Sequence, residues 1–190
     1  MLNYIPLPYR IRKRLSGFRD ETDGTVAVEA VVMLPLILWA FCGLFVFFDA
    51  YRQNAISQKA AYTISDLISR ETAAIDNDYI DGMYSMLNFL TRSGQERRLR
   101  ITIVRFDADD GEYHVEWSET RGTMDPLDDA VVNGWTDTLP VMVDEERLIL
   151  VETRTVYEPP FTVGLSQQTL QTFVFTRPRF APQVLFDASA

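Results

Sequence analysis

The sequence predicts an α+β fold, in which a long N-terminal transmembrane helix continues into a domain with a small, mainly antiparallel sheet. The first observation is an apolar run, residues 25–48, with no Lys, Arg, Asp, Asn or Gln and a single charge at Glu29. Beyond it, apolar residues recur at steps of three and four, which is typical of an amphipathic helix. From Arg98 onward, runs rich in β-branched and aromatic residues alternate with turn residues, which indicates strands.

The apolar run is long enough to cross a membrane. At ~1.5 Å rise per residue it makes a helix of about 36 Å, against a hydrocarbon core of ~30 Å. Basic residues before the run keep the N-terminus in the cytoplasm and send residues 49–190 outward, by the positive-inside rule. These basic residues are Arg10, Arg12, Lys13, Arg14 and Arg19.

The run has two simpler interpretations, a cleaved secretory signal and a plain membrane anchor. A cleaved secretory signal has an apolar region of ~7–15 residues that ends in a small-x-small site. The run is longer, and its end at Val46–Tyr51 offers no such site. A plain membrane anchor stays open. Glu29 argues against it, because an acid at the centre of a membrane helix costs ~2.5–3.5 kcal/mol and so marks a functional position.

The start of the run carries a family resemblance. A basic leader, then Gly24, then an apolar helix with Glu29 as its fifth residue resembles the processing site of type IV prepilins. The string G-T-V-A-V-E-A-V-V-M-L-P-L looks like the TadE-type pseudopilins of Tad (Flp) pilus systems. Near the C-terminus, Arg177-Pro178-Arg179 resembles the closing R-P-R of TadE-like proteins.

The resemblance implies a processing reaction and a set of partners. A membrane-embedded prepilin peptidase would cut between Gly24 and Thr25, on the cytoplasmic side. Glu29 would then form a salt bridge between assembled subunits, and Pro35 would mark a kink where the helix loosens on assembly. Other Tad pseudopilins and pilus-assembly platform proteins would be partners, with the chain in the inner membrane and its C-terminal domain in the periplasm.

Composition bounds the remaining choices. Net charge is −9, and the part after residue 24 carries 13 basic and 24 acidic residues, or −11, which gives no electrostatic footprint for nucleic acid. The single Cys42 lies in the apolar run, so no intramolecular disulfide forms. With one His as well, metal sites of the His/Cys kind are practically excluded, and we expect no cofactor. No phosphate loop or hydrolase motif is present, so we expect no enzyme.

The elements follow in order along the chain. The expected domains are a leader 1–24 that is removed, a transmembrane helix 25–48, a helical region 49–94 and a β-rich periplasmic domain 95–190. The first helix should run for roughly 45 residues, kinked near Pro35 because proline removes an amide donor. Its buried stripe beyond the membrane should be Ile56, Ala60, Ile64 and Leu67/Ile68.

A second helix is expected over Asp78–Leu90, capped by Asp76 or Asp78 and ended by Ser93-Gly94. Its apolar face comprises Ile80, Met83, Tyr84, Leu87 and Leu90.

Four strands are expected after the helices. Arg98–Phe106 and Glu112–Ser118 form a hairpin around an Asp-Gly turn, and Leu148–Tyr157 and Leu170–Thr176 follow a loop at 119–145. On the second strand, strict alternation would place Tyr113, Val115 and Trp117 on one face. The opposite face would carry Glu112, His114 and Glu116, and leave the histidine toward solvent.

The acidic turn does not match a calcium loop. An EF-hand needs Gly at its sixth position and Glu at its twelfth. Counted from Asp107, Gly111 is fifth and Ser118 twelfth.

Two functions stay open from sequence alone. The first is a minor pilin or pseudopilin, processed after Gly24 and needed for pilus biogenesis, adherence or initiation. The alternative is an uncleaved single-pass inner-membrane protein whose periplasmic domain binds a partner.

Overall fold

The computed structural model describes residues 23–91 and 96–189. Helix α2, Asp23–Ser69, runs for 47 residues without a break, which confirms the predicted continuous helix, and Pro35 lies inside it. The chain divides into two compact units at Phe45/Val46. The predicted leader lies outside the described residues, except for its last two.

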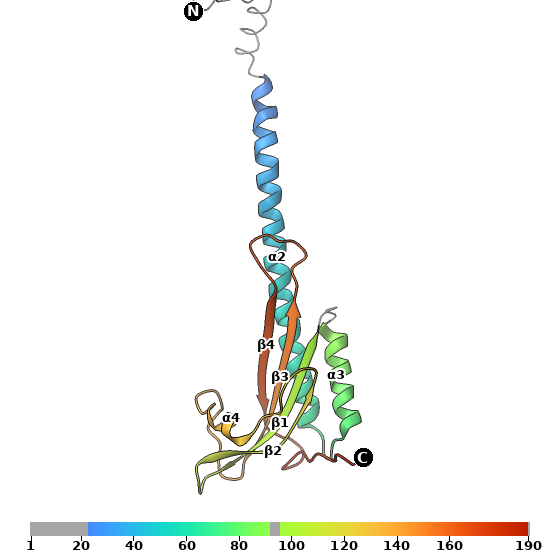
Figure 1. Cartoon of the computed structure of the whole chain (residues 1–190), viewed down its shortest axis with the longest axis vertical. Helices are drawn as coiled ribbons and strands as arrows, with labels where there is room; N and C mark the ends of the chain where they lie inside the picture. The colour runs from blue at the N-terminus through green and yellow to red at the C-terminus, as the bar shows by residue number, and fades with distance from the viewer. Residues whose placement is uncertain (1–22, 92–95, 190) are drawn as a thin grey trace, which may run out of the picture. The chain divides into compact units, whose positions relative to one another are not determined.

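The C-terminal unit contains a four-stranded sheet in the order β2-β1-β3-β4, with every neighbouring pair antiparallel (Figure 1). This confirms the α+β fold. The strands are β1 (Arg97–Asp107), β2 (Glu112–Arg121), β3 (Arg147–Tyr157) and β4 (Gln168–Thr176). At the predicted hairpin, Gly111 has a φ of 74° and its amide donates to the carbonyl of Asp107 at 3.0 Å.

Helix α3, Asn77–Thr91, matches the predicted second helix. Asp76 caps it, because its Oδ1 accepts from the amide of Tyr79 at 2.7 Å. Ile80 and Leu87 are fully buried, as the apolar face predicts. The expected end at Ser93-Gly94 lies outside the described residues.

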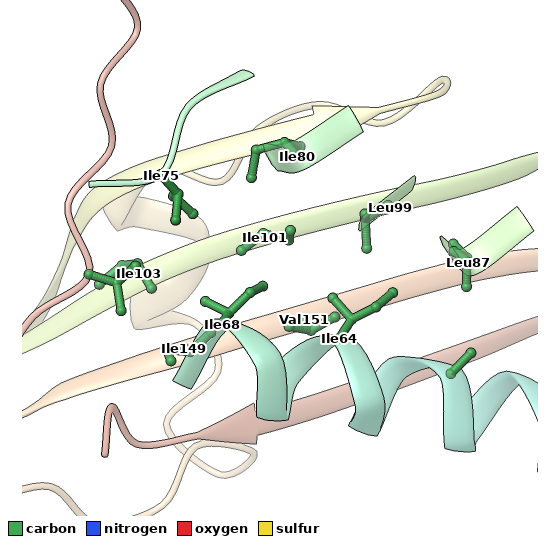
Figure 2. Close-up of a cluster of buried hydrophobic side chains, with 12 residues drawn as sticks. Ile64, Ile68, Ile75, Ile80, Leu87, Leu99, Ile101, Ile103, Ile149 and Val151 are labelled. Carbon is green, nitrogen blue, oxygen red and sulfur yellow. The ribbon is translucent and has the colours of Figure 1, made fainter. Parts of the chain in front are cut away.

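The main core lies between the two helices and one face of the sheet (Figure 2). Ile64 and Ile68 of α2 lie against Ile101 of β1 and Val151 of β3, and all four are fully buried. At ~25 cal/mol per Å² of apolar area, packing of this kind is the main term that holds a helix to a sheet. The remaining buried members are Ala60, Ile75, Ile80, Leu87, Leu99, Ile103, Ile149 and Val184.

The buried stripe of α2 differs from the prediction at two positions. Ile56 is only half-buried, and its neighbour Ser57 is buried instead. Ile64 and Ile68 are fully buried, four residues apart, whereas Leu67 is only half-buried. Sequence steps of three and four both fit a helix, so periodicity alone left Leu67 and Ile68 open. In the structure, Ile68 packs against the sheet and Leu67 does not.

A β-bulge corrects the predicted faces of β2. Ile103 pairs with Trp117, but the next residue of β1, Val104, pairs with Val115, so Glu116 is the extra residue. The bulge shifts the alternation, and Trp117 therefore packs on the core beside α2 while Tyr113 and Val115 pack on the opposite face. The prediction that all three share one face was wrong.

The opposite face of the sheet carries a second, smaller core. Its buried members come from the strands and from residues 119–145, which contain one short helix, α4 (Asp129–Asn133). They are Val104, Tyr113, Leu127, Val132, Leu139, Met142, Leu148 and Leu150.

Several hydroxyl groups lie along the interface between α2 and strands β3 and β4. Ser57 and Ser65 of α2 are buried there, and the hydroxyl of Ser65 donates to Oγ1 of Thr176 at 2.7 Å. Three buried threonine hydroxyls have no hydrogen-bond partner among the described residues, and an unpaired buried hydroxyl is destabilising. They belong to Thr153, Thr155 and Thr172.

Candidate processing and assembly site

The predicted processing position lies in the first described turn of α2. Gly24 and Thr25 are both helical, and a Cβ built on Gly24 would meet no atom within 4 Å. A larger side chain at residue 24 therefore fits the described chain without a clash. Any effect of such a substitution on processing would arise in a complex with another protein.

Glu29 lies one helical turn after Thr25. Its four-residue separation corresponds to ~6 Å along the axis. Its side chain is exposed, as are those of residues 26–41 around it, and most of these are large and apolar. No described residue forms an ion pair or hydrogen bond with Glu29. The site thus places a carboxylate among exposed apolar side chains of the described part of α2.

At the other end of the apolar run, Asp49 makes a contact that sequence reasoning missed. Its Oδ2 accepts a hydrogen bond from the hydroxyl of Tyr157 at 3.0 Å, and that hydroxyl is also 3.4 Å from the carbonyl oxygen of Val46. Tyr157 is the last residue of β3 and is buried. Burial, together with the Asp49 carboxylate, raises the pKa of Tyr157 to about 12.

The contact ties the end of the sheet to the end of the apolar run. Asp49 is the first charged residue after Glu29, so the sequence alone could have identified it as the end of the membrane segment. Its partner is 108 residues away, and nothing in the sequence pairs the two.

The acidic turn forms a separate cluster around the histidine. Ligand atoms of Asp107, Asp110 and His114 all lie within 4.8 Å of one another. His114 Nε2 is 2.9 Å from Asp110 Oδ2, and Nδ1 is 3.1 Å from Oδ2 of Asp129 on α4. The hydrogen bonds that His114 donates to the carboxylates of Asp110 and Asp129, the first having the larger effect, raise its pKa.

The groups of this cluster already have protein partners. Asp110 Oδ1 accepts from the amide of Glu112 at 2.9 Å, and Asp129 Oδ1 accepts from the amide of Val115 at 2.7 Å. Both ring nitrogens of His114 are engaged. The arrangement therefore fastens the β1–β2 turn to α4, and His114 is half-buried rather than simply turned to solvent.

The membrane segment is the remaining feature of the site. In the described part of the chain, one helix is long and apolar enough to cross a membrane, and a signal sequence near an N-terminus meets the same criterion. With the antiparallel sheet that follows it, this helix gives a pilin-like architecture. Comparison with protein-family models, curated proteins and solved structures finds no match to the chain.

Proposed function

We propose that the chain is a non-enzymatic, pilin-like membrane subunit of the TadE type. In this proposal a prepilin peptidase removes residues 1–24, and the mature chain takes part in building a Tad-type pilus together with other pseudopilins and platform proteins. The leader faces the cytoplasm, and the sheet domain faces the periplasm. The proposal covers both a subunit that is retained in the filament and one that acts only in its initiation.

The observation that carries the proposal is the combination at the start of α2. A basic leader, Gly24 and a fifth-position Glu29 precede an apolar helix that continues unbroken to Ser69, where it packs on an antiparallel sheet. A plain anchor needs neither the glycine nor the acid. In a subunit assembly, the carboxylate of Glu29 has a defined role, because it can pair with the α-amino group that cleavage creates at Thr25.

The attraction between the Glu29 carboxylate and the α-amino group of Thr25 gives the acid a role in this proposal. At ~4 Å and an effective dielectric of about 20, a carboxylate and an ammonium group gain ~4 kcal/mol before desolvation is subtracted. At the membrane boundary, water can serve Glu29 in an isolated subunit. In an assembly that excludes water, the amine of Thr25 in the same or a neighbouring subunit takes its place and sets the register between subunits.

The test is the intact mass of the protein extracted from the membranes of its native cells. The chain has a mass of 21.8 kDa over 190 residues, so loss of residues 1–24 should lower the mass by about 2.8 kDa. Gly24→Val should retain the full mass, because a β-branched residue would obstruct the peptidase. Gly82→Val is the matched control: Gly82 is also helical, a Cβ there also meets nothing within 4 Å, and processing should be unaffected.

Two outcomes would contradict the proposal. A native protein that retains Met1 would favour the alternative, an uncleaved single-pass protein with a partner-binding domain. Processing of Gly24→Val at the normal position would show that Gly24 does not define the cut.

A further inference from the structure

The loop that joins β3 to β4, residues 158–167, lies beside α2 where its apolar run ends (Figure 1). Two hollows near the end of the apolar run are each lined by residues of both the loop and α2. One, of about 440 Å³, is lined by Asp49 and Gln53 of α2 and by Pro159 and Pro160 of the loop. Together with the hydrogen bond between Tyr157 and Asp49, this fixes the start of the loop at the level of residue 49.

The second hollow, of about 610 Å³, places Leu165 of the loop at the same level. It is lined by Phe47 and Tyr51 of α2 and by Leu165 of the loop, with residues 168–171 of β4. Phe47 and Phe48 are the last residues of the apolar run and are 55% and 72% exposed. The loop is thus next to the turn of α2 at which a membrane-crossing helix would leave the hydrocarbon.

The composition of the loop suits that position. Its sequence is E-P-P-F-T-V-G-L-S-Q, and its one charge, Glu158, stands at the start. Residues 159–167 carry no charge, although the part of the chain after residue 24 has a net charge of −11. Phe161 is 48% exposed, and Tyr51 on the adjacent face of α2 is 75% exposed. Aromatic side chains favour the headgroup level of a bilayer.

We propose that residues 158–167 form a second contact with the membrane, in addition to α2. Phe161 and Leu165 contact lipid at the boundary between headgroups and acyl chains, and the larger hollow, next to Phe47, accommodates part of a lipid molecule. The occupant is lipid rather than a protein, because this surface is continuous with the exposed apolar surface of Phe47 and Phe48. The contact would hold the end of the sheet against the bilayer. It rests on the proposed membrane crossing of α2.

Depth measurements with nitroxide labels test this contact in the full chain reconstituted into phosphatidylcholine vesicles. Collision with oxygen, which concentrates in hydrocarbon, is compared with collision with a water-soluble nickel chelate. The native Cys42 carries the label that reports the membrane crossing. In a Cys42→Ala background, Thr162→Cys carries the label on the loop, with Phe161 still present.

Val141→Cys in the same background is the matched control. Val141 is 93% exposed, and its neighbour Pro140 lies against Leu148 and Thr176, at the opposite end of the strands. Because β3 has 11 residues, that end is about 33 Å from Tyr157 along the strand. It is therefore beyond the reach of the headgroups in this proposal.

We expect the label at 162 to be at headgroup depth, the label at 42 in hydrocarbon and the label at 141 in water. Phe161→Ser should make the label at 162 at least several-fold more accessible to nickel and leave 141 unchanged. A label at 162 that behaves like the one at 141, while 42 is in hydrocarbon, would overturn the loop contact alone. A label at 42 in water would overturn the membrane crossing and the contact with it. Protection at 162 that disappears as lipid is added at constant protein would assign the cover to a second copy and would also overturn the lipid contact.

Discussion

Two adjacent residues of α2 allow a sharp test of how the helix packs on the sheet. Ile68 is fully buried among Ile64, Ile101 and Val151, whereas its neighbour Leu67 is half-buried and stands outside that core. The two side chains have the same number of atoms. Replacing each with Ala therefore removes the same chemistry from two positions that differ by one step, about 100°, around the helix.

The expected costs differ because only one position leaves a cavity. Ile→Ala in a close-packed core lowers the free energy of unfolding by about 2–5 kcal/mol, through lost burial and the space left behind. Leu67→Ala loses part of its burial, about 1 kcal/mol, and nearby groups or solvent can fill the space. The difference of at least ~1–2 kcal/mol corresponds to roughly a 5- to 30-fold change in the ratio of folded to unfolded protein.

Pulse proteolysis of the full chain in detergent micelles, over a urea series, measures the midpoint of unfolding of the sheet domain. Ile68→Ala should lower the midpoint clearly more than Leu67→Ala, with an unchanged dependence on urea. Equal midpoints, or a larger loss at Leu67, would contradict the packing in which Ile68 is the buried residue.

Three further predictions concern single groups. Glu29→Leu should be inserted and processed normally, yet electron microscopy should find no pili; normal pili would remove the role assigned to Glu29. His114 should titrate by NMR above the free value of ~6.5, because the carboxylates of Asp110 and then Asp129 accept hydrogen bonds from the protonated ring and so favour it. Its contribution to stability is therefore complete below pH ~6.5 and is lost as pH rises through the folded-state pKa; a midpoint at or below ~6.5 would refute this. Thr153→Val replaces a buried, unpaired hydroxyl by a methyl group and should raise the free energy of unfolding by about 1 kcal/mol; a loss of stability would show that the hydroxyl has a partner.

The elements could be predicted where the signal is local. The cap at Asp76 and the Asp-Gly turn at Gly111 each depend on a few neighbouring residues, and both were found where expected. The bulge at Glu116 could not be predicted, because β2 alone shows an unbroken alternation. The bulge places Trp117 on the helix side of the sheet, where its Nε1 donates to the carbonyl of Val184 at 2.8 Å. That partner is 67 residues away.

The candidate site divides in the same way. Gly24 and Glu29 could be selected from sequence because their spacing along one helix is itself the signal. The contact between Asp49 and Tyr157 joins a helix to the end of a strand, so it exists only once the sheet has formed. The position of the 158–167 loop beside the apolar run depends on that contact and was equally invisible in the sequence.

The two acids at the ends of the apolar run differ in how they are satisfied. Asp49 has its partner, Tyr157, within the same chain. Glu29 stands among exposed apolar side chains, and no described residue pairs with it. An unpaired carboxylate in hydrocarbon costs several kcal/mol, so an assembly that excludes water must supply a cation there. The α-amino group at Thr25, one turn away, would be such a cation, and it exists only after cleavage. Asp49 is therefore paired within the described chain, whereas in the proposed assembly the α-amino group of Thr25 would pair with Glu29.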